Sequence, residues 1–301
     1  MTAALMYHDV VPAGAEDTSG FPGRDAALYK VTPEQFGAHL EAIRHLFPTG
    51  AGASRAPQRG CRVGDPASSA RPDADTSPRT SLSSARCGRR RSSSDLPTIT
   101  FDDGGASAMT AADALERHGF TGHFFITANC IGTRGFVTAQ NLRELRERGH
   151  VIGSHSCSHP LRMGHCSWPQ LLDEWTRSRS MLSGILGEDV EVASVPGGDF
   201  APQVAEAAAK AGFARLFTSE PTLDARHAFA LTLLGRFTIQ RWTTADGAAA
   251  LAAGEWLACA RQAVVWNAKK ISKRLGGERY LQLRKLLLRH GDEVRWGDRA
   301  V

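Results

Sequence analysis

The sequence predicts an α/β fold built on a parallel sheet. Short apolar runs at 96–101, 122–126 and 151–154 alternate with longer segments of helical periodicity, which is typical of repeated βα units. Acidic or imidazole side chains follow directly after two of these runs, where the strands of a parallel sheet present their carboxyl ends. These observations fit both an incompletely closed (β/α) barrel with parallel strands and a doubly wound open sheet.

The N-terminal part predicts one strand and one helix. A short apolar strand begins near Leu5 and ends at His8, and a polar loop with several glycines follows it through Tyr29. Thr32 then supplies an N-cap and Gln35 its capping-box partner, with a proline between them at the first helical position. We therefore expect a helix over 31–47, whose apolar residues form one core-facing stripe.

The remaining elements follow the same alternation along the chain. A second start signal, from Ser167 to Gln170, predicts a helix that ends near Leu186. The other expected strands are 96–101, 122–126, 151–154, 192–195 and 214–218, and the other expected helices are 108–118, 138–148 and 202–211.

Composition divides the chain into four parts. Residues 1–47 hold the N-terminal strand and helix, 96–245 form the core, and 246–301 form a C-terminal helical extension. Residues 48–95 contain no aromatic residue, ten serines and nine arginines without a lysine. Such a composition cannot bury enough apolar surface to offset chain entropy, so we expect a disordered insertion there. A translated frameshift would give a similar composition.

Charge is concentrated outside the expected core. The whole chain has a net charge of +5, and residues 261–301 carry eleven basic and four acidic side chains among leucines. This pattern predicts basic amphipathic helices, which either contact an anionic membrane surface or acidic polymer, or pack on the core with a solvated face.

The sequence contains no secretory signal and no apolar run long enough to span a bilayer. We therefore expect a cytoplasmic protein, at the inner membrane face if the basic helices bind lipid. Six cysteines form no Cys-x-x-Cys pair, which argues against a structural zinc site or a disulfide framework.

Two clusters of chemically active side chains follow predicted strands. Asp102 and Asp103 come after the strand at 96–101, and His155 and His159 come after the strand at 151–154. If 155–159 form a helical turn, the two imidazoles share a face and Asp103 can supply an oxygen nearby. Cys157 would then point away from that face and would not be a ligand. Taken singly, each cluster would be a turn or a surface helix.

Two histidines and one carboxylate, with a position left for water, describe a catalytic metal site and not a structural one. Zinc in such a site lowers the pKa of bound water to about 7 and polarises a carbonyl group. Asp102 would point to the other side of the backbone and remain free to accept a proton.

These clusters resemble the motifs of the polysaccharide deacetylase family, which is carbohydrate esterase family four with a NodB-like homology domain. The matching segments read Thr-Phe-Asp-Asp-Gly at 100–104 and His-Ser-Cys-Ser-His-Pro at 155–160. The resemblance covers about 98–217 well. It implies a distorted, incompletely closed (β/α) barrel, a divalent metal ion, usually zinc, on Asp103, His155 and His159, and Asp102 as general base.

The N-terminal strand resembles a branch of the family that acts in polysaccharide biosynthesis. Its Tyr-His-Asp-Val segment at 7–10 is similar to the start of circularly rearranged members, where an N-terminal strand brings a catalytic histidine to the pocket. This resemblance implies that His8 is the general acid that protonates the departing amine. A buried histidine at a strand end is the competing interpretation. The histidines at 165, 227 and 290 are expected at the surface.

One motif departs from the family pattern. Many members carry Arg-x-Pro-x-Gly, whose arginine orients the base, whereas this chain reads Ser-Val-Pro-Gly-Gly at 194–198. Some export and biofilm relatives have a similar Pro-Gly-Gly, so the change does not exclude activity. The charge partner of Asp102 is therefore left unassigned, and we expect Pro196, Gly197 and Gly198 to form a wall of the substrate pocket.

Three functions are compatible with these residues. The leading one is a metal-dependent hydrolase that removes N-acetyl groups from amino sugars of a polysaccharide or a lipid-linked glycan. The second is a catalytically silent carbohydrate-binding relative, suggested by the missing arginine. The third is a binder of anionic polymers such as nucleic acid, which no groove-reading motif supports. No stable protein partner is expected.

Overall fold

A curved sheet of nine strands forms the centre of the computed structural model, which describes residues 2–47 and 96–268. The strand order is β11-β1-β4-β5-β6-β7-β8-β10-β9, and every neighbouring pair is parallel except β9 and β10. The parallel pair β2 and β3 forms a second, two-stranded sheet. The strands are β1 (Ala4–Tyr7), β2 (Asp9–Val10), β3 (Lys30–Val31), β4 (Thr98–Phe101), β5 (Gly122–Ile126), β6 (Val151–Ser154), β7 (Val192–Ser194), β8 (Arg215–Phe217), β9 (Arg226–Ala228), β10 (Leu231–Leu234) and β11 (Phe237–Thr238).

The strand order shows that the sheet curls into a barrel that does not close. β10 and β11 lie toward opposite ends of the order, yet only Gly235 and Arg236 connect them. A connection this short spans on the order of 10 Å, so the two edges approach each other at this seam. The predicted incompletely closed barrel is confirmed. The alternative doubly wound sheet is wrong, because the strand order from β4 to β8 never reverses.

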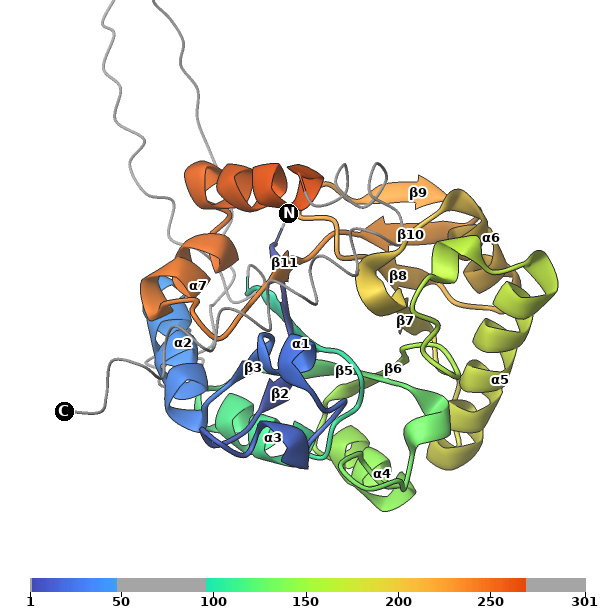
Figure 1. Ribbon diagram of the computed structural model, residues 1–301, viewed down its shortest axis with the longest axis horizontal. Coiled ribbons are helices and arrows are strands. Elements are labelled where there is room, and N and C mark those ends of the chain that lie inside the picture. The colour runs from blue at the N-terminus through green and yellow to red at the C-terminus, as the bar shows by residue number, and fades with distance from the viewer. Residues whose placement is uncertain (1, 48–95, 269–301) are drawn as a thin grey trace, which may run out of the picture.

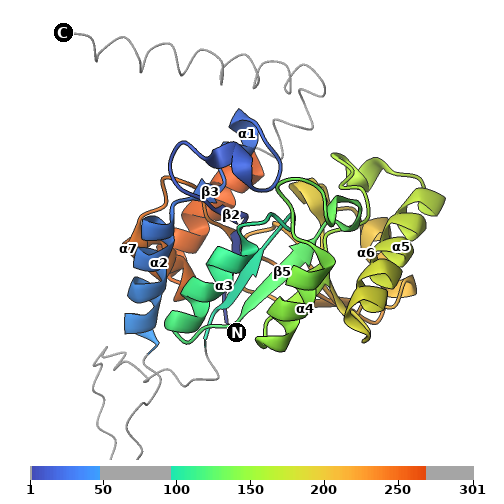
Figure 2. The same cartoon turned by 90° about the horizontal axis from the view of Figure 1, so that it is seen from below.

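The helices surround the outside of this curved sheet, as Figure 1 shows for α2 to α6. Viewed from below, α2, α3 and α4 stand side by side, while α1, β2 and β3 lie together at one end of the barrel (Figure 2). The helices are α1 (Arg24–Ala27), α2 (Pro33–Leu46), α3 (Ala108–Arg117), α4 (Ala139–Glu147), α5 (Trp168–Leu186), α6 (Pro202–Lys210) and α7 (Ala245–Ala252), and a further helix occupies 256–268.

The helix starts follow the predicted capping chemistry. Thr32 Oγ1 accepts the Gln35 amide proton at 3.2 Å, and Gln35 Oε1 accepts the Thr32 amide proton at 3.0 Å. A capping box also opens α5 at Ser167 and Gln170, as predicted. The first of these helices begins at Pro33 and not at residue 31, because Lys30 and Val31 pair with β2.

The two faces of the sheet carry different side chains. Residues that point outward, such as Leu5, Ile99 and Phe124, join the main core beneath the helices. Residues that point into the barrel form a smaller apolar cluster, whose fully buried members are Ala4, Phe125, Val192 and Phe217. This alternation follows the two-residue period of a strand. The interior is therefore packed, and the open end of the barrel lies at the carboxyl ends of the strands.

Two predictions concern regions beyond the described ranges. The disordered insertion predicted at 48–95 lies outside the described residues, and so do most of the predicted basic helices, from residue 269 onward. Within the described ranges, no helix combines the length and the apolar character needed to cross a bilayer. The four described cysteines, at 130, 157, 166 and 259, are free thiols.

Candidate metal centre

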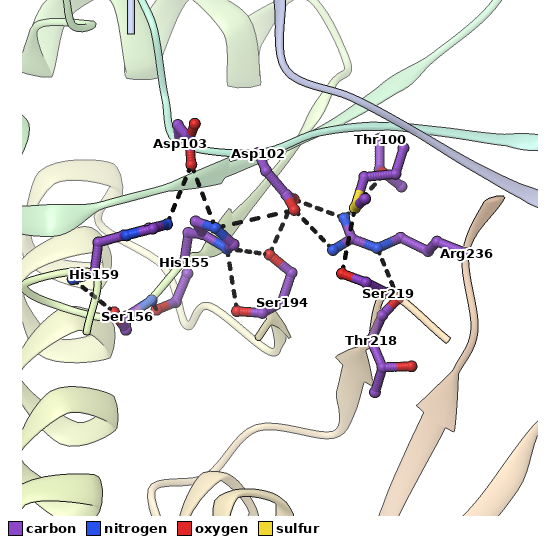
Figure 3. A network of polar contacts seen from close by, with 12 residues as sticks. Thr100, Asp102, Asp103, His155, Ser156, His159, Ser194, Thr218, Ser219 and Arg236 are labelled. Atoms are coloured by element: carbon purple, nitrogen blue, oxygen red, sulfur yellow. Dashed lines mark hydrogen bonds and ion pairs between the residues drawn. The ribbon is translucent and has the colours of Figure 1, made fainter. Parts of the chain in front are cut away.

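Three side chains converge at the carboxyl ends of β4 and β6. Asp103 Oδ1 lies 3.4 Å from His155 Nε2 and 3.5 Å from His159 Nε2. One ligand atom from each residue falls within 4.8 Å of the other two, which is close enough to share one metal ion. Figure 3 shows both imidazoles directed at the Asp103 carboxylate. The structure thus brings together the residues that the sequence predicted as ligands.

The backbone that achieves this convergence is not the predicted helical turn. Residues 155–159 form a loop after β6, in which Ser156 and His159 have φ angles of 64° and 58°. Asp103 also has a positive φ, of 74°. Positive φ is uncommon for residues other than glycine, and strained backbone of this kind is concentrated at functional sites. Left-handed residues, and not a shared helix face, therefore aim the imidazoles at one point.

Glu174 of α5 holds this histidine loop in place. Its Oε2 accepts the backbone N–H groups of Cys157 and Ser158, both at 2.8 Å, and its Oε1 accepts the Ser158 hydroxyl. The Cys157 thiol donates instead to Asn129 Oδ1 at 3.2 Å, and burial raises its pKa. Cys157 therefore stays a protonated thiol that faces away from the metal ligands, as predicted, although the loop and not a helical turn directs it there.

His155 is fixed in the tautomer that a metal ligand needs. Its Nδ1 donates to Ser194 Oγ at 2.5 Å, and the Ser194 hydroxyl donates in turn to Asp102 Oδ1 at 3.1 Å. This arrangement leaves the lone pair of His155 Nε2 directed at Asp103. For His159, burial and then the charge of His155 lower the pKa to about 4, so the ring is neutral at neutral pH. A neutral imidazole is the form that binds a metal ion.

The second carboxylate of the motif faces a buried arginine. Asp102 accepts two hydrogen bonds from Arg236, from Nη1 to Oδ1 at 2.6 Å and from Nη2 to Oδ2 at 2.8 Å. Arg236 is completely buried, and its other donors reach Thr100 Oγ1 and the Thr218 carbonyl, each at 3.1 Å. Its guanidinium lies over the rings of Phe125 and Phe217, 5.5 and 5.9 Å from their centroids. Four of the five N–H groups of Arg236 therefore donate to neighbours that hold the guanidinium fork in place.

The charges around the two carboxylates keep both of them ionised. Burial raises the pKa of Asp102. The opposing effects of Arg236 and then of His155 are together larger, so the pKa of Asp102 lies well below its ordinary value. Burial also raises the pKa of Asp103, and the contact with His155, followed by the nearby His8, brings it below its ordinary value. Two adjacent carboxylates therefore remain charged in a buried site, one beside an arginine and the other beside imidazoles.

His8 directly follows Tyr7, which pairs with Phe101 and whose carbonyl accepts the Asp102 amide proton at 3.1 Å, so the end of β1 lies beside the end of β4. The Nδ1 of His8 is buried and has no hydrogen-bond partner among the described residues. Its ring packs against the ring of Tyr29, with centroids 4.9 Å apart. The N-terminal strand therefore delivers His8 to the site, as the sequence predicted. Its role as general acid remains a prediction.

Residues 11–29 form an N-terminal loop on one side of the site. A buried ion pair between Lys30 and Asp9 holds this loop in place. Lys30 Nζ donates to the carbonyls of Glu16, Ser19 and Phe21 at 2.6–2.8 Å and lies 3.6 Å from Asp9 Oδ2. Asp9 Oδ1 accepts the hydroxyls of Ser19 and Ser107 at 2.6 and 2.8 Å, which ties the loop to the start of α3. This loop places the ring of Phe21 against the ring of His159, with centroids 4.8 Å apart.

The Pro-Gly-Gly segment lies beside this centre as a short 3-10 turn after β7. Pro196 is buried, and Gly197 and Gly198 have φ angles of 63° and 66°. A Cβ on Gly197 would come 3.2 Å from the Leu161 carbonyl, just beyond the histidine loop. The turn therefore packs against the segment that follows the metal ligands. That it contacts substrate remains a prediction.

Sequence reasoning missed three residues of the site, namely Ser194, Glu174 and Arg236. Ser194 occupies the motif position of the missing arginine, and Arg236 supplies the positive charge from the barrel seam. One signal was available, because Arg236 stands alone inside an apolar run at 231–239, and a charged residue in a buried strand needs a partner.

Comparisons with known proteins agree with this geometry. A family profile described as polysaccharide deacetylase matches residues 90–216, a range that contains both halves of the metal centre. Over this range the chain is similar to the polysaccharide deacetylase family. Two similar proteins from Bacillus subtilis are the putative polysaccharide deacetylase YxkH, 24% identical over 160 residues, and the peptidoglycan-N-acetylmuramic acid deacetylase PdaA, 28% identical over 129 residues.

These matches cover parts of each family member. The alignments span 53% and 42% of this chain, and 55% and 47% of YxkH and PdaA, so the chain spans about half the length of these relatives. Among solved structures, the polysaccharide deacetylase BC0361 from Bacillus cereus superimposes with a TM-score of 0.57 at 18% identity, covering 83% of this chain and 68% of BC0361. At this identity the superposition shows that the two proteins share a fold.

Proposed function

We propose that this protein is a metal-dependent hydrolase that removes N-acetyl groups from amino sugars of a polysaccharide or a lipid-linked glycan. The observation that carries the proposal is the convergence of Asp103, His155 and His159 beside the Asp102–Arg236 pair. Two imidazole nitrogens and one carboxylate oxygen suit zinc, which is the ion we propose. The name of the relative PdaA, a peptidoglycan-N-acetylmuramic acid deacetylase, supports an N-acetylated sugar as substrate.

The residues divide the work of amide hydrolysis among them. A divalent ion held by Asp103, His155 and His159 would supply Lewis-acid polarisation of the acetamide carbonyl. Asp102 accepts the proton of the water that attacks the carbonyl carbon, and the paired guanidinium of Arg236 keeps this carboxylate ionised and oriented. As the C–N bond breaks, His8 donates a proton to the departing amine, and acetate and the free amino sugar leave.

Arg236 also bears on the alternative of a catalytically silent relative. That alternative was motivated by the absence of an arginine at the motif position occupied by Ser194. In the folded chain a different arginine makes a bidentate contact with the proposed base. The base therefore has the charge partner that catalysis requires, which supports a turnover-competent site.

The decisive experiment measures acetate release from N-acetylglucosamine oligomers and from peptidoglycan fragments. We expect release by the zinc-loaded protein, loss after chelation, and recovery when zinc is restored. Asp103→Asn should abolish both zinc binding and release, whereas His227→Gln, an exposed histidine on β9, should change neither. Metal and glycan binding without any acetate release would instead identify the silent relative.

A further inference from the structure

The helix at 256–268 presents an apolar face to solvent. Trp256, Leu257, Val264 and Val265 are 78%, 66%, 68% and 48% exposed. Spacings of seven and eight residues place Leu257, Val264 and Val265 on the outer half of the helix. Arg261 is the one charged side chain of this half within the described part of the helix.

The opposite side of the same helix is anchored to the barrel. Ala258 and Cys259 pack against the main core, and Gln262 makes two hydrogen bonds of 2.9 Å with the backbone N–H and C=O of Thr238 in β11. In Figure 1 this helix is the red-orange one beyond α7, next to β11. The outward direction of the apolar residues is therefore fixed by the anchored side.

Such a concentration of exposed apolar side chains is unusual for a free surface. Ten large hydrophobic residues are exposed within the described ranges, and four of them lie on these thirteen residues. The other six are scattered singly over the fold, which is normal for a globular protein. A contiguous apolar patch marks a surface that is covered by a partner or a membrane.

The charge pattern of the sequence indicates which partner covers it. Residues 269–301, which follow the helix directly, carry ten basic and four acidic side chains and begin with Lys269 and Lys270. By contrast, residues 1–47 and 96–260 together carry sixteen basic and twenty-three acidic side chains. Positive charge is therefore concentrated in the sequence that follows the apolar face, whereas residues 1–47 and 96–260 have a net negative charge.

We propose that the face formed by Trp256, Leu257, Val264 and Val265 docks the protein on an anionic lipid surface. Apolar and tryptophan side chains enter the boundary between headgroups and acyl chains, while neighbouring lysines and arginines attract the anionic headgroups. A second copy of the chain is a poorer occupant, because pairing this face would bring two strongly basic segments together. Docking of this kind would hold the catalytic domain at a surface that carries its glycan.

Vesicle sedimentation with the full-length chain tests this proposal independently of catalysis. We expect binding to vesicles of phosphatidylcholine and phosphatidylglycerol, at least tenfold weaker binding to phosphatidylcholine alone, and weaker binding at high salt. The double variant Trp256→Ser, Leu257→Ser should lose at least tenfold in partitioning. Trp242→Ser, which changes a tryptophan that is 60% exposed outside the helix, is the matched control and should bind as the wild type does.

Three outcomes would overturn the proposal. The first is equal binding to anionic vesicles by the wild type and the double variant, with thermal melting showing that both are folded. The second is light scattering that finds a dimer which the double variant converts to a monomer, because a second copy would then occupy the face. Absence of vesicle binding by the wild type also counts against it.

Discussion

Arg236 and Asp102 are joined by two hydrogen bonds, of 2.6 and 2.8 Å, across 134 residues of sequence. The arginine belongs to the two-residue connection between β10 and β11, where the barrel edges approach. Gly235 beside it has no space for a side chain, because a Cβ would lie 2.4 Å from the Glu220 carbonyl. Closure of the barrel and the electrostatics of the proposed base therefore depend on the same short segment.

Substitution of Arg236 should damage catalysis more than metal binding. Arg236→Gln leaves a buried carboxylate without its charge partner, so we expect acetate release to fall by about 100-fold and the free energy of unfolding to fall by about 3–5 kcal/mol. Arg236→Lys retains a charge but not the bidentate fork. Its activity and stability should therefore lie between those of the wild type and those of Arg236→Gln. Steady-state kinetics, zinc content and urea denaturation measure the three quantities.

Arg226→Gln is the matched control for the arginine series. Arg226 lies on β9, and its side chain is 56% exposed in an ion pair with Glu220. A surface pair of this kind contributes little, so activity and stability should stay near those of the wild type. If Arg236→Gln turned over substrate as fast as the wild type, the proposed dependence of the base on this arginine would be wrong.

His8→Gln tests the proposed general acid. Loss of a positioned proton donor should lower kcat by about 100- to 10,000-fold. Zinc content and KM should change little, because His8 is not among the three clustered ligands. His165→Gln, on the exposed side of the turn after the histidine loop, serves as the control. A variant that loses zinc together with activity would instead assign His8 to the metal site.

Most of the fold was predictable because its signals are local. Capping residues such as Thr32 and Gln35, and apolar runs such as 122–126, are set by neighbours a few residues away, and the elements appear where these signals stand. The seam between β10 and β11 was not predictable. It arises from closure of the whole sheet, which the short strands after residue 218 do not encode by themselves.

The candidate site was likewise predictable where its signals are local, and not where they depend on the whole fold. Asp103, His155 and His159 are marked by motifs, and they converge. The predicted reason for convergence was wrong, because periodicity cannot reveal that Ser156 and His159 adopt left-handed backbone. The partner of Asp102 depends on a contact across the barrel, so its identity as Arg236 follows from the fold and not from any local pattern.

Glu174 should control metal affinity without touching the metal. Its carboxylate holds two backbone N–H groups of the histidine loop, at Cys157 and Ser158. Glu174→Gln weakens both contacts, so we expect zinc affinity to fall by about 10- to 100-fold, as for other groups that orient metal ligands. Competition with a chelating dye measures the affinity. Asp173→Asn, next to it on the exposed face of α5 and paired only with Arg177 among the described residues, should leave the affinity unchanged.

His123 should make the folded state sensitive to mild acid. Its ring lies inside the barrel near the rings of Phe125 and Phe217, and its buried Nδ1 has no hydrogen-bond partner among the described residues. Burial, and then the charge of Arg215, lower the pKa of His123 to about 4. The unfolded chain, with a pKa of about 6.5, binds more protons between these values, so stability is lost as pH falls through this window.

His123→Phe removes this penalty and keeps an aromatic ring in the barrel. Going from about pH 7.5 to about pH 5, the wild type should lose ~2 kcal/mol more in free energy of unfolding than His123→Phe does. Urea denaturation at the two pH values gives both numbers, and His227→Gln, which changes an exposed histidine on β9, should follow the wild type. Equal losses in the wild type and His123→Phe would mean that His123 takes up its proton inside the folded barrel as readily as in the unfolded chain.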